Sequence, residues 1–210
     1  MDQNICLHAI NSYNDIYTIN LNNNKLKYIL KDHALLSRRM LGLTDSIGFN
    51  GIDYISLCDY EKRNIHPINH PKYTSYEAYI RESLSLIFPK DKLEIVTPTI
   101  IDVITTTKQG YRDMAYLGMS QDKRYSDLYD EVQVKNKISL DLMCGITIPF
   151  HKINNSIFGI NQNTKTITKH LTKIKKLLIE YNHDVPIYDI DTMHEIKNEE
   201  DIKKLVKKYY

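Results

Sequence analysis

The sequence predicts a mixed α/β domain (α+β) with a split, mainly antiparallel sheet and a cleft between the two halves of that sheet. Short stretches with the two-residue period of strands occur in clusters, and stretches with helical spacing interrupt them. The strands and helices do not alternate one by one, as they do around a parallel sheet. These two observations favour an antiparallel core with flanking helices over a doubly wound fold.

Composition and charge exclude few functions. The chain has 210 residues, enough for one domain with an extension, and its 28 basic and 26 acidic side chains nearly cancel. A dedicated DNA-binding domain is usually more basic. The cysteines Cys6, Cys58 and Cys144 are widely spaced and include no CxxC pair, which favours a reduced interior. With no signal peptide and no apolar run of about 18 residues, we expect a cytoplasmic protein, or one exported without a cleavable signal, and no membrane partner.

The first half of the chain predicts two strands and a helix. Residues 5–10 form an apolar run that contains His8. Residues 25–33 have leucine and isoleucine at helical spacing, and residues 34–39 leave that helix. Residues 52–58 alternate between two sides, as a strand does. Histidines and prolines after residue 60 predict a surface loop.

The rest of the chain predicts three helices and further short strands. A helix is expected at residues 75–88, because six side chains form a largely apolar face and Pro89 follows. Residues 164–181 form an amphipathic helix with a lysine row on its polar side, and Asn198 caps a last helix that has acids in its first turn and lysines in its last. The expected strands are at residues 93–96, 100–106, 131–134, 145–149 and 185–190.

The order of four motifs resembles that of the ADP-ribosyltransferase superfamily. The motifs are LHAI at residues 7–10, a helix that ends in Ser-Arg at residues 25–38, DYISL at residues 53–57 and EVQV at residues 131–134. Residues 142–149, 173–181 and 185–190 are similar to the branch that includes DNA-modifying toxins. The resemblance implies a catalytic domain at residues 1–190 and a C-terminal helical extension at residues 191–210.

The resemblance also implies a mono-ADP-ribosyltransferase that uses NAD as its substrate and binds no metal. Glu131 would be catalytic, because a carboxylate stabilises the oxocarbenium-like centre that forms when the nicotinamide–ribose bond breaks. Four residues would bind NAD: His8 through a ribose or the nicotinamide amide, Arg38 through the pyrophosphate, Tyr54 by stacking, and Ser56 by bracing Glu131. We predict that His8, Tyr54, Ser56 and Glu131 converge on one cleft.

The acceptor is a protein or a nucleic acid, and the sequence does not choose between them. The polar loop at residues 120–129 carries Gln121, Arg124 and Tyr125, a set suited to presenting an acceptor. Tyr129 stands two positions before Glu131, where arginine-directed relatives have an acid or a glutamine, so arginine is disfavoured as the acceptor. A role as a toxin or effector fits this branch.

Several alternatives stay open. Taken one by one, His8 fits a core histidine, Arg38 and Arg39 a solvated helix end, and Tyr54 and Ser56 ordinary packing. Arg39 is an alternative to Arg38 at the pyrophosphate.

The same site suits an NAD glycohydrolase, in which water replaces the acceptor. An inactive module that binds nucleic acid or protein through the lysine-rich helix is a third possibility. The trio of Cys58, His66 and His70 lacks a fourth ligand, so we predict no zinc site.

Overall fold

A seven-stranded sheet forms the centre of the protein. The computed structural model describes residues 4–11, 25–43, 53–62, 84–96, 131–150 and 164–209. The strands lie in the order β5-β6-β3-β1-β4-β8-β9, and every pair is antiparallel except β8–β9. Their bounds are β1 (Ile5–Asn11), β3 (Tyr54–Asp59), β4 (Leu84–Pro89), β5 (Ile95–Val96), β6 (Glu131–Lys135), β8 (Gly145–Ile148) and β9 (Ile187–Asp189).

A second, two-stranded sheet lies beside the first. It pairs β2 (Ala34–Leu36) with β7 (Lys137–Ser139) in antiparallel register. The described ranges also contain the helices α2 (Lys25–Asp32), α6 (Thr164–Glu180) and α7 (Glu199–Tyr209), and three short 3-10 helices (Tyr60–Lys62, Lys90–Lys92 and Leu140–Leu142). The prediction of a mixed α/β fold with a mainly antiparallel sheet is therefore confirmed. No helix in the described ranges has the length and apolarity needed to cross a membrane.

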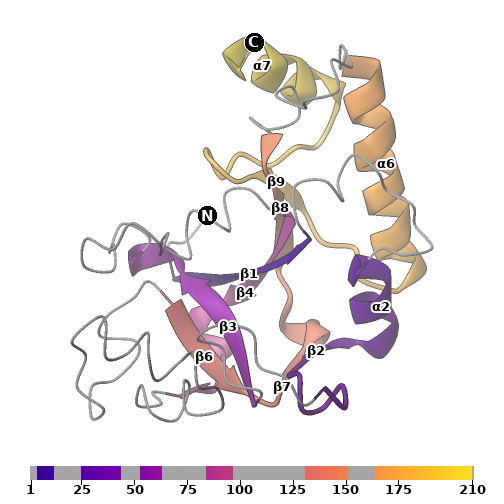
Figure 1. Ribbon diagram of the computed structural model, residues 1–210. Helices are drawn as coiled ribbons and strands as arrows, with labels where there is room; N and C mark the ends of the chain where they lie inside the picture. Colours follow the sequence, from indigo (N-terminus) through magenta and orange to yellow (C-terminus); the bar gives the residue numbers. More distant parts are fainter. Residues whose placement is uncertain are drawn as a thin grey trace.

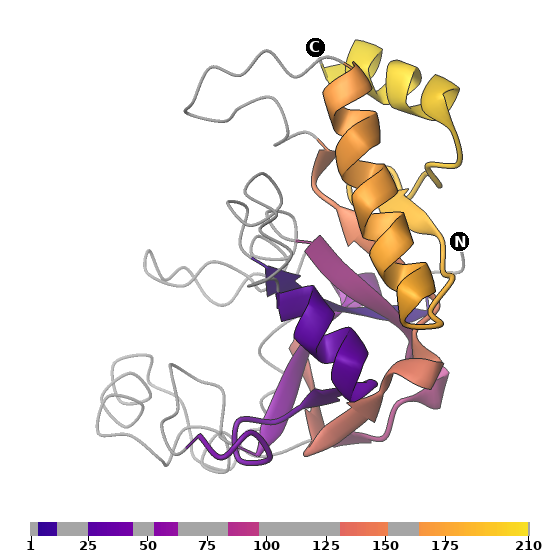
Figure 2. The same ribbon diagram turned by 90° about the vertical axis from the view of Figure 1, so that its right-hand side faces the viewer.

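The helices cover one face of the large sheet. Figure 2 shows α2 and α6 lying in front of the strands, and Figure 1 shows α7 beside the upper end of α6. Apolar side chains from α2, α6 and α7 join those of β1, β3, β4, β6 and β8 in the larger core cluster. We call this side of the sheet the helix face. Burial of its leucines, isoleucines and Phe88 supplies the main driving force for folding.

The opposite face of the sheet carries a smaller apolar cluster. Leu7, Cys58 and Ile87 lie at its centre, and Tyr60 and Tyr188 pack around them. We call this side the open face. Residues on one strand alternate between the two faces, so the register of the sheet assigns each position to one of them.

The expected helix at residues 75–88 is wrong at its end. Residues 84–89 form β4, which pairs with β1 on one side and β8 on the other. Leu84, Leu86 and Phe88 face the helices, while Ile87 faces the open side. Because β4 is buried on both faces, its apolar run lacks the alternation of a half-buried strand, and its spacing also suits a helix. The rest of the expected helix and the strand at residues 100–106 lie outside the described residues.

Most other expected elements are found within a few residues of their predicted ends. α2 ends where His33 adopts a positive φ of 49°, and its N–H donates to the carbonyl of Leu30 at 3.2 Å. Residues 34–36, expected only to leave the helix, pair with β7 instead. α6 and the last helix match their predictions closely.

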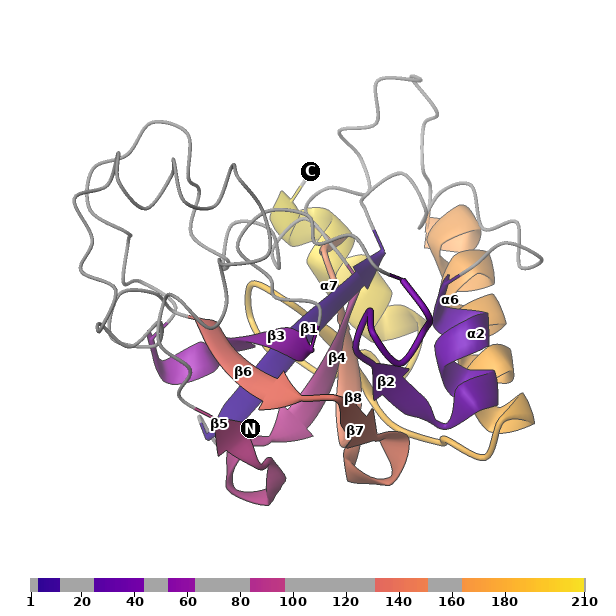
Figure 3. The same ribbon diagram turned by 60° about the horizontal axis from the view of Figure 1, so that its bottom comes forward.

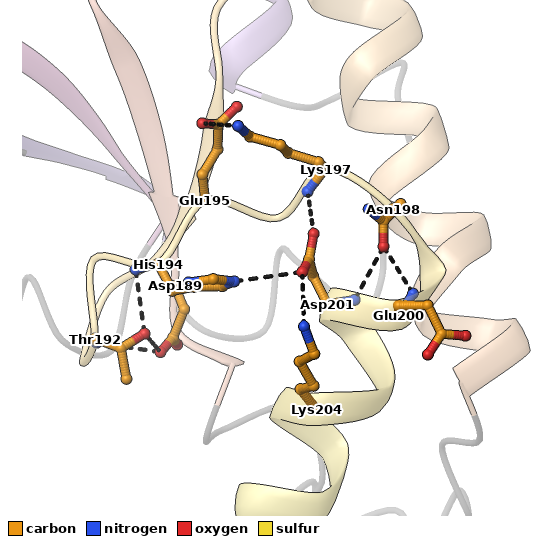
Figure 4. A network of polar contacts seen from close by, with 9 residues as sticks. All are labelled: Asp189, Thr192, His194, Glu195, Lys197, Asn198, Glu200, Asp201 and Lys204. Carbon is orange, nitrogen blue, oxygen red and sulfur yellow. Dashed lines mark hydrogen bonds and ion pairs between the residues drawn. The ribbon is translucent and has the colours of Figure 1, made fainter.

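A polar network, which we call the clasp, holds the C-terminal segment in place. It is formed by Asp189, Asn198, Asp201 and Tyr209 with their hydrogen-bond partners, and Figure 4 shows the part around the start of α7. Asn198 Oδ1 accepts from the N–H groups of Glu200 at 2.9 Å and Asp201 at 3.2 Å, as predicted for the cap of α7. Asp201 also accepts from the backbone N–H of Lys197 at 3.0 Å. The buried Asp189 accepts from the Tyr209 hydroxyl at 2.8 Å, so the last turn of α7 is tied to β9.

Candidate functional site

Three strands that carry predicted motifs are direct neighbours. β3, with Tyr54 and Ser56, pairs with β6 on one side and β1 on the other, and Figure 3 shows the three strands side by side. Long-range pairing thus brings together segments that are far apart in the sequence. The sequence analysis predicted that residues of these strands converge on one cleft and gave no strand order.

His8 lies on the helix face, opposite Leu86 of β4. Its Nδ1 lies 2.7 Å from the backbone carbonyl oxygen of Ser56. A carbonyl can only accept, so Nδ1 carries the proton in this contact. Burial lowers the pKa of His8, and the hydrogen bond to Ser56 opposes that shift. The neutral ring therefore keeps Nε2 as its acceptor nitrogen.

Ser56 makes one contact that was not predicted. Its hydroxyl oxygen accepts from Nε2 of Gln133 at 3.0 Å, and both side chains are buried. In the register of β3 and β6, Ser56 stands opposite Gln133 and Cys58 stands opposite Glu131. Ser56 therefore braces Gln133, a residue that the motif comparison did not single out.

The register divides the predicted site between the two faces. Leu7 stands opposite Cys58, and Cys58 opposite Glu131, so position 131 belongs to the open face together with Ser56. His8 belongs to the helix face. The prediction that the four motif residues converge on one cleft is therefore wrong for His8. The physical reason is the two-residue period of strands, which sends neighbours in one strand to opposite faces.

A cavity of about 480 Å³ lies beside α2 and brings two predicted residues together. His8 lines it from β1, and Arg38 lines it from the segment after β2. The volume is in the range of small-molecule sites. Lys25, Tyr28 and Asp32, one face of α2, also line it, and sequence reasoning had missed all three. Their shared spacing on the helix was the only signal that could have found them.

The cavity has a charged and an apolar part. Lys25 and Arg38 bring two cations and Asp32 one carboxylate, while Tyr28 and Leu41 lie more than half exposed at its lining. This combination suits a ligand with an anionic part and a flat ring. The His8 side chain reaches the cavity from the helix face of β1.

The structure separates the two adjacent arginines. Arg39 forms a two-pronged ion pair with Asp53, in which Nε contacts Oδ1 and the second contact, from Nη2 to Oδ2, spans 3.2 Å. This pair raises the pKa of Arg39 and lowers the pKa of Asp53. Arg38 instead lines the cavity. Of the two, Arg38 is thus the one placed to meet a ligand there.

Tyr54 and Ser56 are not among the described residues that line the cavity. Tyr54 is half-buried on the open face, where it stands opposite Lys135. Only the backbone position of Glu131 is described. Gln121, Arg124 and Tyr125 lie outside the described residues. Within the described ranges, no set of three or more His, Cys, Asp or Glu side chains has the spacing of a metal site.

Comparisons with known proteins add no family to this picture. No protein-family model matches the chain, and no curated protein or solved structure is significantly similar to it.

Proposed function

We propose that this protein is a mono-ADP-ribosyltransferase that uses NAD and transfers ADP-ribose to a macromolecular acceptor. The observation that carries the proposal is the cavity lined by both His8 and Arg38. These residues belong to the first two motifs of the resemblance. The pairing of β3 with both β1 and β6 adds support, because it groups the strands of the first, third and fourth motifs.

In this proposal the cavity binds NAD. The Arg38 guanidinium offers a forked donor set that matches the pyrophosphate, and Lys25 adds a second cation. Nε2 of the neutral His8 accepts from the nicotinamide amide or a ribose hydroxyl. Tyr28, 55% exposed, offers an aromatic surface to one of the two bases.

The proposed reaction breaks one bond and forms one. Nicotinamide leaves with the electron pair of the bond to ribose C1′, which gains oxocarbenium character. A lone pair of the acceptor then bonds to C1′, and the acceptor's proton passes to a base or to water. A carboxylate near C1′ opposes the positive charge, a role that the resemblance gives to Glu131. Position 131 lies on the face opposite His8, so replacement of Glu131 tests this role separately from NAD binding.

The proposal is tested with NAD that carries separate labels on nicotinamide and on adenosine. The protein is incubated with this NAD and a mixture of protein, single-stranded DNA and RNA. Transfer predicts equal release of nicotinamide and incorporation of the adenosine label into one acceptor class. Free nicotinamide with free ADP-ribose would replace the proposal by an NAD glycohydrolase. Binding of NAD without products would indicate an inactive module, and no binding would refute the NAD proposal.

A further inference from the structure

Two histidines meet at the junction of α2 with the turn that follows α6. Nδ1 of His33 lies 3.3 Å from Nε2 of His183, although the residues are 150 positions apart in the sequence. The two rings are tilted by 51° with their centroids 5.4 Å apart, so they approach through their nitrogens instead of stacking face to face. Figures 1 and 2 show the lower end of α6 close to α2.

The backbones of both histidines are fixed by hydrogen bonds. The N–H of His33 donates to Leu30, and its carbonyl accepts from the N–H of Leu140 at 3.0 Å. The N–H of His183 donates to the carbonyl of Leu178 at 2.9 Å, and its carbonyl accepts from Val185 at 2.9 Å. The two imidazoles are therefore presented from rigid positions, and binding a ligand between them costs little ordering entropy.

The separation of the nitrogens matches a metal site. Two nitrogens bound to one tetrahedral metal at about 2.0–2.1 Å are about 3.3 Å apart. As it stands, the contact needs one shared proton, since one nitrogen donates and the other accepts. A metal ion takes the place of that proton when both rings carry their remaining proton on the other nitrogen.

The surroundings favour a divalent cation. His183 is 7% exposed, while His33 is exposed and gives access from solvent. Asp141 follows Leu140, which binds the His33 carbonyl, and its negative charge acts on His183. The Asp141 carboxylate itself accepts from the Ser139 hydroxyl at 2.9 Å.

We propose that His33 and His183 bind a transition-metal ion such as Zn²⁺, with water completing its coordination. Imidazole ligands suit Zn²⁺, Cu²⁺, Ni²⁺ and Co²⁺ and do not suit Mg²⁺ or Ca²⁺. The ion links the end of α2 to the turn after α6. It thereby fixes one wall of the cavity, because Lys25, Tyr28 and Asp32 all belong to α2. The site is separate from the proposed NAD chemistry and does not depend on it.

The site is tested with the full chain after dialysis against EDTA. Co²⁺ is titrated while visible absorption is recorded, and Tm is measured at increasing Zn²⁺. We expect the intense absorption of four-coordinate Co²⁺ and a rise of roughly 3–5 °C in Tm for each tenfold increase in free Zn²⁺ above Kd. Mg²⁺ at the same concentrations should cause neither change.

Four variants decide the assignment. His33→Asn keeps a residue that tolerates the positive φ and should weaken Co²⁺ binding at least tenfold. His194→Asn removes a half-exposed histidine elsewhere and should leave binding unchanged. His183→Asn should match His33→Asn, with circular dichroism to verify folding. Asp141→Asn should weaken binding less. Equal Co²⁺ affinity in the wild type and His33→Asn, or no Co²⁺ uptake by the wild type, would overturn the proposal.

Discussion

The cavity beside α2 and the clasp around α7 are both rich in charged groups, but they use them differently. In the clasp, Asp189 and Asp201 accept hydrogen bonds from the chain's own donors. In the cavity, Arg38, Lys25 and Asp32 line an open space of about 480 Å³. A buried charge that bonds within the fold contributes to stability, while charged side chains that line an open space are also placed to contact a ligand. Substitutions in the clasp should therefore lower the stability of the fold, and substitutions in the cavity should weaken the proposed binding of NAD.

Replacing the predicted catalytic carboxylate should have the largest effect. Glu131→Gln should lower transfer by about 100- to 1,000-fold, because the amide lacks the charge that opposes the oxocarbenium centre. NAD affinity and Tm should stay near the wild-type values. Single-turnover release of nicotinamide measures this step.

Asp32→Asn is the matched control, because Asp32 is the carboxylate in the lining of the cavity itself. It should reduce the rate far less than Glu131→Gln. The reverse result would assign the catalytic carboxylate to α2 and would remove Glu131 from the site.

The next largest effect is expected at the two adjacent arginines, whose replacement should change NAD affinity to different extents. Arg38→Ala should weaken NAD binding about 10- to 100-fold, the loss expected for hydrogen bonds to a charged group. Arg39→Ala breaks an exposed ion pair with Asp53 and should leave NAD binding unchanged. Calorimetric titration of both variants with NAD checks the difference, and equal losses would contradict the proposed role of Arg38.

In the clasp, Tyr209→Phe should destabilise the fold without touching the cavity. It removes a hydrogen bond to the buried Asp189, which costs about 1–3 kcal/mol of unfolding free energy. Urea denaturation measures the loss, and NAD affinity of the folded variant serves as the control. A change in NAD affinity would mean that clasp and cavity are coupled.

The smallest expected effect is a dependence of stability on pH. Burial lowers the pKa of His8, of His170 and of His183 below the ordinary histidine value of 6.5. Below about pH 6.5 the unfolded chain then binds more protons than the folded one, so stability falls as pH decreases from there toward the folded pKa values. Above about pH 6.5 these histidines bind few protons in either state, so they no longer lower the stability of the fold.

Urea denaturation between pH 7.5 and 5.5, in EDTA, measures this loss. His170→Gln should make the dependence shallower, because one of the three groups no longer titrates. A stability that stays constant over this range would contradict the lowered pKa values.

The sequence by itself determined the elements whose patterns are local. The amphipathic helices α2, α6 and α7 follow from apolar spacing within a few turns, and the cap of α7 follows from Asn198 and the acids after it. β1, β3 and β6 follow from short runs of apolar or alternating residues. It also selected His8 and Arg38, which line the same cavity.

Only the tertiary structure decided what depends on pairing between distant segments. β4 is a strand because β1 and β8 flank it, although its own spacing suits a helix. The register, which no local pattern encodes, put His8 and Ser56 on opposite faces and paired Ser56 with Gln133. The contact of His33 with His183 likewise arises only after α2 and α6 have packed. Sequence periodicity reports which side of an element is apolar, while packing decides what that side meets.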